Sequence, residues 1–444
     1  MDTLIIIQLI IVLALIFIGA RVGGIGLGIF GMIGVGILVF GFGLKPGNAP
    51  IDVMLMIISV ITAAAALQAA GGLDYMVRIA ERILKRNPQN ITYLGPLVCY
   101  FFTFLSGTGH IAYSLLPIIS EIATQSKVRP ERPLSISVIA SQQAITASPI
   151  SAATAALLSV DLLGSHGIQL SDILMVCVPA TIVGVLVAAF VVSFIGVELK
   201  DDPEYQRRVK EGLIELKENK EITKGKHETR RQMWSVIVFL LGVFMIVLFG
   251  SIPSLRPVFV SNGVSSVLGM PDIIEIIMMS IAGIILLISK ANVEKAVKGS
   301  IFGAGMQAVI AIFGIAWMGD TFFNGNIEFF KHSIEGIVRS YPFLFAVALF
   351  VMSILLFSQA ATVRTLYPLG LALGIPPFAL IAMFPAVNGY FFIPNYPTVV
   401  AAINFDRTGS TRIGKYVLNH SFQIPGFVAT IVAVSIGYLI ISFL

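Results

Sequence analysis

Charged residues are scarce in this chain, and their scarcity indicates the class of protein. Asp, Glu, Lys and Arg make up only 12% of the 444 residues, whereas hydrophobic residues make up 57%. A soluble chain has about a quarter charged residues, so this composition indicates a membrane protein. The apolar runs are continuous rather than alternating, which excludes a β-barrel and predicts an all-α polytopic membrane protein.

Cysteine and the common catalytic motifs are also nearly absent. Cys99 and Cys177 lie in apolar segments, where a small buried hydrophobe is favoured over a disulfide or a metal ligand. No GxSxG, HExxH, Walker loop or paired metal-ligand spacing occurs. We therefore expect neither an enzyme nor a metal centre nor a cofactor. The net charge of +5 comes mostly from loop residues, which orient a membrane protein rather than recruit nucleic acid.

Ten apolar segments approach the ~20 residues that a transmembrane helix needs. They are Thr3–Ala20, Val22–Leu44, Ile51–Ala70, Leu134–Leu158, Ile173–Ile195, Met233–Gly250, Ile273–Ser289, Ile301–Asp320, Phe378–Ala402 and Phe422–Leu444. The first segment has no basic stretch before it and no small-residue cleavage site after it, so we interpret it as a span rather than a signal peptide.

The basic residues predict how these spans are oriented, because cytoplasmic loops are enriched in Lys and Arg. Five basic clusters lie within residues 78–86, 127–132, 197–232, 290–298 and 407–415. The loops at 45–50, 161–171 and 251–271 nearly lack such residues. Ten spans put all five clusters on the cytoplasmic side and both termini on the periplasmic or outer side.

The two halves of the chain have the same order of segments. Each half has three spans, an amphipathic helix, a hairpin and two more spans, and the odd number of spans inverts the second half. The predicted units are an N-terminal repeat 1–196 with a hairpin at about 92–124, a cytoplasmic linker 197–232, and a C-terminal repeat 233–444 with a hairpin at about 341–374. The amphipathic pieces are Asp74–Arg86 and Asn326–Arg339, and a third is expected in the linker at Glu204–Glu218.

Four polar breaks interrupt apolar segments at matching places in the two halves. They are the hairpin tips Ser106–His110 and Ser358–Arg364, and the Pro-containing runs Thr146–Ser151 and Pro394–Thr398. Irregular backbone at membrane depth needs a partner, and helix N-termini favour a carboxylate. Freed carbonyls suit Na⁺ instead. Paired breaks are the best sequence indication of a transporter site, although small residues also permit close helix packing.

The breaks supply the predicted substrate-binding residues, which offer hydroxyls, backbone N–H groups, amides and two basic side chains. These are Ser106, Thr108, Gly109, His110, Thr146, Ser148, Ser151, Gln359, Thr362, Arg364, Asn395 and Thr398. Arg364 could grip a carboxylate with two hydrogen bonds, or form a structural pair. His110 could bind substrate, carry a proton or be structural. Asp74 and Asp320 are interpreted as caps of the amphipathic helices that follow them, with proton or cation coupling as the alternative.

At these motifs the chain resembles the anaerobic C4-dicarboxylate transporters, the Dcu A/B family. The matching stretches cover nearly the whole length and are Gly19–Gly24, Leu44–Gly47, Ala70–Asp74, Arg86–Pro88, Gly107–Gly109, Arg129–Pro133, Ala147–Ser151, Ala316–Asp320, Ser358–Ala361, Pro394–Pro397, Phe405–Gly409 and Asn419–His420. The short charged linker and Gly319–Phe322 look more like the A branch than the B branch.

The resemblance implies bacterial inner-membrane transport of fumarate, succinate, malate and aspartate, by exchange or by Na⁺- or H⁺-coupled uptake. It also implies an ion-transporter-superfamily fold, with about ten transmembrane helices plus two re-entrant hairpins, a scaffold and an elevator-like transport domain. We expect a homodimer in lipid, and a membrane sensor kinase could dock on the basic loops. A cation/proton antiporter or another organic-anion carrier on the same scaffold remains the alternative.

Overall fold

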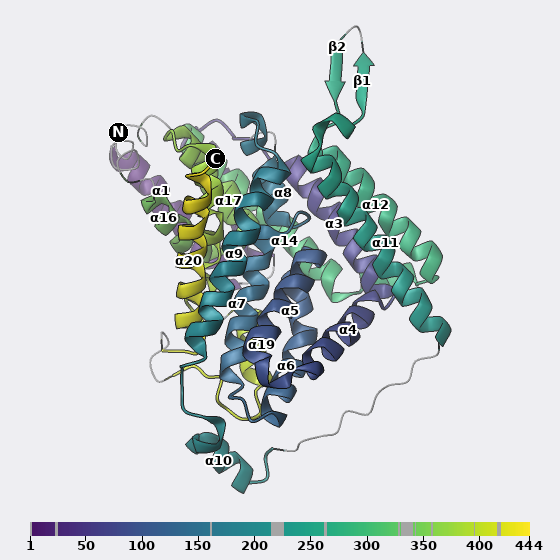
Figure 1. Ribbon diagram of the computed structural model, residues 1–444. Helices are drawn as coiled ribbons and strands as arrows, with labels where there is room; N and C mark the ends of the chain where they lie inside the picture. Colours follow the sequence, from purple (N-terminus) through teal and green to yellow (C-terminus); the bar gives the residue numbers. More distant parts are fainter. Residues whose placement is uncertain are drawn as a thin grey trace.

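The computed structural model describes most of the chain and is largely helical (Figure 1). The described residues are all except 1, 23–24, 160–161, 215–225, 262–263, 327–328, 330–340, 342, 357, 395 and 415–418. Six of the described helices are long and apolar enough to cross a membrane. They are α3 (Ile51–Ala69), α9 (Leu170–Val192), α11 (Lys226–Ser251), α12 (Met270–Ser289), α14 (Ser300–Gly325) and α20 (Gln423–Ile441). The chain is thus a multi-pass membrane protein.

The other four predicted spans do not belong to this set. The first is α1 (Asp2–Val22), and the second consists of α2 (Gly26–Gly36) and a π-helical turn over Ile37–Gly41. The fourth is divided into α7 (Glu131–Ala147) and α8 (Ala152–Leu158), as its polar break predicts.

The ninth predicted span is interrupted over a longer stretch than the sequence indicates. Its first helix, α18 (Pro377–Met383), ends early, and two 3₁₀ turns follow at Phe384–Val387 and Gly389–Phe391. The helix α19 then runs from Pro397 to Phe405. Pro385 lacks the N–H that would continue α18, so the helix changes its hydrogen bonding well before the Pro394–Thr398 run.

Two pairs of helices contain the predicted hairpin tips. The first pair is α5 (Ile91–Ser106) and α6 (Ala112–Gln125), joined through a 3₁₀ turn at Gly109–Ile111. The second pair is α16 (Leu344–Leu356) and α17 (Gln359–Ala372). Gly107 ends α5 in the left-handed conformation, with φ of +68°, which a glycine adopts without strain.

The amphipathic helix expected at Asp74–Arg86 is present as α4 (Gly72–Arg86), which buries Met76, Ala80 and Leu84. Most of its expected counterpart, Asn326–Arg339, lies outside the described residues. The linker helix α10 (Pro203–Lys210) is shorter than the expected Glu204–Glu218, because Gly212 ends it with φ of +67°. Asp202 caps its start by accepting the N–H groups of Glu204 and Tyr205.

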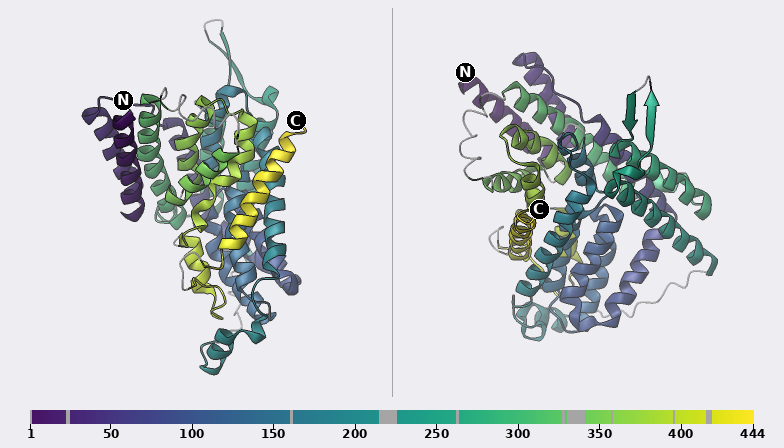
Figure 2. Two further views of the ribbon diagram at one scale, coloured as in Figure 1. Left: turned by 90° about the vertical axis from the view of Figure 1, so that its left-hand side faces the viewer. Right: turned by 45° about the horizontal axis from the view of Figure 1, so that its top comes forward.

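The two ends of the helical body differ in what they carry. The start of α1 and the end of α20 lie at one end, and α10 lies at the other (Figures 1 and 2). A hairpin of β1 (Val258–Ser261) and β2 (Val264–Val267) projects beyond α11 and α12 at the end opposite α10 (Figure 1).

Helices α2 and α14 pack with their backbones in direct contact. A Cβ atom built on Gly314 would lie 1.8 Å from the carbonyl oxygen of Gly28, so only glycine fits there. Further along α14, Asp320 accepts the N–H of Asn48 at 2.6 Å and Trp317 donates to the carbonyl of Gly47 at 2.8 Å. Asp320 lies inside α14 and anchors the loop before α3, and most of the amphipathic helix that it was expected to cap lies outside the described residues.

Candidate functional site

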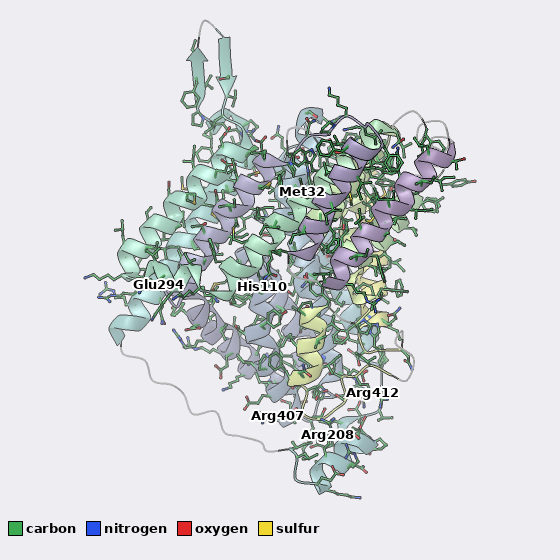
Figure 3. The ribbon with its side chains drawn as sticks, turned by 180° about the vertical axis from the view of Figure 1, so that it is seen from behind. Met32, His110, Arg208, Glu294, Arg407 and Arg412 are labelled. Carbon is green, nitrogen blue, oxygen red and sulfur yellow. The ribbon has the colours of Figure 1, made fainter. Side chains whose placement is uncertain are left out.

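The polar breaks surround a cavity of about 460 Å³ inside the helical body. His110, at the first hairpin tip, lines it and lies between the end with the β hairpin and the end with α10 (Figure 3). Six of the twelve predicted binding residues line this cavity: Ser106, Thr108, Gly109, His110, Gln359 and Thr398. Three of the four breaks thus contribute lining residues. The fourth, Thr146–Ser151, contributes none itself, although Ile145 and Ala152 on either side of it line the cavity.

One wall of the cavity is polar and contains several helix ends. The first turns of α8, α17 and α19 reach it through Ala152, Gln359 and Thr398. The first N–H groups of a helix lack partners within the helix and carry partial positive charge. No Asp, Glu, Lys or Arg is among the described lining residues. Backbone dipoles, rather than cationic side chains, therefore make this wall attractive to an anion.

Thr398 carries a hydroxyl that is available to a ligand. Its side chain is only 3% exposed, it lines the cavity, and its Oγ1 has no hydrogen-bond partner among the described residues. A buried polar group without a partner is costly, and a carboxylate oxygen in the cavity would supply one. Thr398 is the second residue of α19, so its hydroxyl and the helix N-terminus act at the same place.

The first hairpin tip packs tightly against the break between α7 and α8. Ser148 donates through its hydroxyl to the carbonyl of Phe104 at 2.7 Å. A Cβ on Gly109 would lie 2.8 Å from the amide nitrogen of Gln142, so the glycine lets that amide approach the tip. Ser106 donates to the carbonyl of Thr108 at 3.2 Å, which fixes the tip's own backbone.

A chain of buried amides supports the polar wall from behind. Gln359 donates from Nε2 to Gln142 at 3.0 Å and to Asn388 at 3.1 Å. Asn388 then donates to Gln143 at 3.3 Å, and Gln143 donates to Thr430 at 3.1 Å. These bonds connect α7, α17, the 3₁₀ segment after α18 and α20. They hold the second hairpin against the broken span of the first half.

The opposite wall is apolar and is formed by α2, α3 and α14. Its lining side chains are Leu27, Ile57, Val60, Ile61, Ala64, Ile301, Ala304, Gly305, Gln307, Ala308, Ala311 and Ile312. Gln307 is the one amide among them. The two walls thus differ sharply: hydrogen-bonding groups concentrate on the side built from the breaks.

Four of the predicted hydroxyl ligands do not line the cavity. Thr146 donates to the carbonyl of Gln143 at 2.8 Å, and Thr362 donates to the carbonyl of Ser358 at 2.8 Å. Ser151 caps α8 by accepting the N–H of Thr154, and Ser148 is bonded to Phe104 as described. The hydroxyls of Thr146, Thr362 and Ser151 serve the local backbone, a common role of Ser and Thr in helices, whereas that of Ser148 joins the break to α5. Asn395, also predicted, lies outside the described residues.

Arg364 is buried but lies away from the cavity. Its side chain is 4% exposed and donates from Nη1 to the hydroxyl of Ser159 at 3.0 Å. This geometry matches the structural alternative rather than direct contact with substrate. The guanidinium ties α17 to the end of α8. The first turns of these two helices both form part of the polar wall.

Several lining residues were not among the predicted ligands. They include Gly107, Tyr113, Gln142, Gln307, Ser358 and Tyr396. Tyr113 stacks on His110 with ring centroids 6.1 Å apart. A signal was available for Ser358 and Gly107, since both belong to the hairpin-tip motifs. Tyr396 likewise belongs to the Pro394–Thr398 break. Tyr113 and Gln307 carried no such signal, because the direction in which their side chains point depends on how the helices pack.

The described residues contain no group of three or more His, Cys, Asp or Glu side chains that could hold a metal ion. Cys99 and Cys177 are both free and buried, as the sequence predicts. What the cavity offers is anion-stabilising N–H and hydroxyl groups around a small volume.

Comparison with known proteins agrees with this chemistry. A family model described as an anaerobic C4-dicarboxylate membrane transporter matches residues 4–444. The C4-dicarboxylate transporter DcuA of Escherichia coli K12 is 44% identical over 99% of this chain and 100% of its own length. DcuA of Wolinella succinogenes is 42% identical over 98% of both chains. DcuB of E. coli O6:H1 is 39% identical over 98% of this chain and 97% of its own length.

Two solved transporter structures share the fold. The YdaH transporter of Alcanivorax borkumensis superposes with a TM-score of 0.57 at 15% identity, covering 92% of this chain and 88% of that one. MtrF of Neisseria gonorrhoeae, from a class of antimetabolite efflux pumps, gives 0.54 at 12% identity over 90% and 82%. These relatives are transporters and not enzymes. The motif resemblance is thereby confirmed, and the chain belongs to the family of anaerobic C4-dicarboxylate membrane transporters.

Proposed function

We propose that this protein exchanges C4-dicarboxylates, namely fumarate, succinate, malate and aspartate, across the bacterial inner membrane, or takes them up with Na⁺ or H⁺. The observation that carries the proposal is the convergence of helix N-termini and the Thr398 hydroxyl on one cavity whose described lining residues include no carboxylate. Anions at a helix N-terminus gain up to about 2 kcal/mol in partly buried geometries. Two carboxylates bound at the first turns of different helices would each gain this stabilisation.

The polar wall would bind substrate in named positions. Thr398 and the N–H groups of α19 would hold one carboxylate, and the first turn of α17 with the Thr108 tip would hold the other. Gln359, fixed by Gln142 and Asn388, presents its amide between them. His110 would contribute a ring nitrogen from the tip, while Arg364 would keep α17 in position rather than touch substrate.

The site is proposed to lie within an inverted-repeat fold. The repeats would be 1–196 and 233–444, with about ten spans and re-entrant hairpins at the α5–α6 and α16–α17 pairs. The α10 end, which carries Arg129, Arg132 and Arg208, would be cytoplasmic by its basic charge. The start of α1 and the end of α20 lie at the opposite end, which would be periplasmic (Figure 2).

The difference between the two walls supports elevator-like movement. Elements of the polar wall would form the transport domain, and the apolar wall of α2, α3 and α14 would belong to the scaffold. Because the hydrogen-bonding groups are concentrated on one wall, substrate could move with that wall. A homodimer and a docked sensor kinase stay predictions. Measuring transport after deletion of residues 217–226 would show whether the linker is a docking loop or a part needed for transport.

Two alternatives rest on the same fold. Another organic anion would use the same first turns, so competition by a panel of mono- and dicarboxylates against labelled fumarate would reveal it. A cation/proton antiporter needs a carboxylate in the cavity, and the described lining residues supply none. The anion reading therefore has the stronger support.

The test is counterflow in proteoliposomes loaded with succinate and given labelled fumarate. We expect exchange by the wild type and a KM raised about tenfold by Thr398→Val, which removes one hydrogen bond to a charged group without changing shape. Thr362→Val is the matched control, since the Thr362 hydroxyl is bonded to Ser358 and Thr362 is not among the described residues that line this cavity.

Each negative result has a distinct meaning. Absence of exchange and of uptake with folded wild-type protein would overturn the function. Exchange that responds equally to Thr398→Val and Thr362→Val would leave the function standing and overturn the site assignment.

A further inference from the structure

A second hollow, of about 570 Å³, lies at the α10 end of the molecule, far along α19 from the substrate cavity. Three arginines line it: Arg208 from α10, and Arg407 and Arg412 from the loop that follows α19. Figure 3 shows the three side chains gathered at this end. None of them belongs to the polar wall, and the proposed transport reaction does not use them.

The loop that carries two of these arginines is held by Asp406. Its Oδ1 accepts the N–H and the hydroxyl of Thr408, and its Oδ2 accepts the hydroxyl of Ser410 and the N–H of Thr411. All four residues are buried. The carboxylate of Asp406 is therefore occupied by the loop itself, and the loop presents its arginines from a fixed backbone.

Arg208 joins the linker helix to this loop. Its Nη1 donates to the carbonyl of Arg407 at 3.0 Å, and its Nε donates to Glu204 at 2.7 Å. Gly409 has φ of +75°, and a Cβ there would lie 2.6 Å from the central carbon of the Arg208 guanidinium. The glycine thus lets the guanidinium lie against the loop backbone. Glu204 also pairs with Arg207, so it offsets only part of the positive charge.

Two groups in the hollow are available to a ligand. Thr411 lines it, is 2% exposed, and its Oγ1 has no hydrogen-bond partner among the described residues. Arg412 is exposed, and no described carboxylate forms an ion pair with its guanidinium. A buried hydroxyl without a partner beside several guanidinium groups indicates an absent anionic ligand with several acceptor oxygens.

We propose that this hollow, formed by Arg208, Arg407, Arg412 and Thr411, binds a phosphate group. Guanidinium groups match phosphate oxygens with paired hydrogen bonds, and a tetrahedral phosphate reaches donors on several sides. The phosphate comes either from a free phosphorylated solute or from the headgroup of an anionic phospholipid at the membrane face. Both sources present the same chemistry to these side chains.

The experiment measures binding of two probes to the purified full-length protein. Inorganic phosphate is titrated calorimetrically against detergent-solubilised protein, and retained phosphatidylglycerol is measured by native mass spectrometry after reconstitution. Arg412→Gln and Thr411→Val test the site. Arg207→Gln is the matched control, since Arg207 is the neighbour of Arg208 on α10, pairs among the described residues with Glu204 and Glu211, and is not among those that line the hollow.

We expect Arg412→Gln to weaken binding about tenfold or more, as loss of a hydrogen bond to a charged group predicts, while Arg207→Gln binds like the wild type. Sensitivity of phosphate binding identifies a free solute, and sensitivity of retained phosphatidylglycerol identifies a lipid headgroup. Either result supports the site. Failure of both probes to bind, or equal binding by Arg412→Gln and Arg207→Gln, overturns it. Arg412 is exposed, so its substitution leaves folding intact.

Discussion

The guanidinium of Arg364 donates to the hydroxyl of Ser159 across 3.0 Å, and both side chains are buried. The bond links α17 to the residue that ends α8, and the two residues are 205 positions apart in sequence. Both helices begin at the cavity of about 460 Å³. A charged residue inside an apolar segment thus serves to align two helix N-termini, without touching the space between them.

Arg364→Ala should therefore lower stability as well as transport. Removing the guanidinium removes the hydrogen bond that the Ser159 hydroxyl accepts, although this hydroxyl still donates to the carbonyl of Ala156 at 2.8 Å. Loss of a hydrogen bond to a charged group costs about 1.5–3 kcal/mol, and the truncation leaves a cavity in addition. Thermal unfolding in detergent should show the loss, and Ser159→Ala should show a smaller one. A variant with unchanged unfolding temperature but a strongly raised KM for fumarate would instead make Arg364 a direct substrate ligand.

The amide chain behind the cavity predicts graded effects. Asn388→Leu removes the acceptor for Gln359 and the donor for Gln143, so stability should fall by about 1–3 kcal/mol and KM should rise, although Asn388 does not line the cavity. Thr430 lies at the end of this hydrogen-bond series farthest from Gln359, so Thr430→Val should lower stability with little effect on KM. Equal KM changes in the two variants would contradict transmission through Gln359.

The close contact of α2 with α14 predicts different outcomes for two glycines on one helix. Gly314→Ala places a methyl group against the carbonyl of Gly28 and should cost about 1–3 kcal/mol or more through overpacking. Gly303→Ala, on the same helix, meets nothing within 4 Å and should be neutral or stabilising. The two variants are compared by their unfolding temperatures and by their rates of dicarboxylate exchange in proteoliposomes. Similar behaviour of the two would refute the packing argument.

The docking of α10 should depend on pH through Asp202. Burial raises the pKa of this carboxyl, but the N–H groups of Tyr205 and Glu204 and the Arg129 guanidinium outweigh burial, so the pKa lies below its usual value. A lowered folded-state pKa stabilises the folded form above the unfolded pKa of about 3.9, and the stabilisation disappears as pH falls through the folded value.

Hydrogen exchange of the α10 amides, corrected for intrinsic rates, tests this. Protection should persist at neutral pH and fall below about pH 4. Asp202→Asn should reduce protection at neutral pH and flatten the profile, since the amide keeps the cap but loses the charge pair with Arg129. Constant wild-type protection down to pH 3 would contradict the role of Asp202.

The sequence predicted where the backbone would be irregular, because proline, glycine and clustered hydroxyls interrupt apolar runs locally. That was enough to indicate Ser106, Thr108, Gln359 and Thr398 as residues that would come together. It was also enough to predict the break between α7 and α8. These features are determined by residues that are neighbours in the sequence, so a single sequence is enough to predict them.

The direction of each side chain could not be read in the same way. Thr362 and Thr398 look equivalent in the sequence, yet the first is bonded to its own helix backbone and the second lines the cavity. The choice depends on which face of the helix meets a neighbour. The same holds for Asp320, whose partner Asn48 is 272 residues away. Such contacts arise only when the helices are packed.

The bond between Gln142 and Gln359 spans 217 positions of the chain, and this separation has a consequence for biogenesis. A ribosome adds roughly 5–20 residues per second, so Gln142 is made roughly 10–40 s before its partner. Until then the Gln142 amide lies within a membrane segment without its hydrogen-bond partner Gln359, and unsatisfied polar groups are costly there. Closure of the cavity is therefore a late step of membrane assembly, and the first half must wait in an unfinished arrangement.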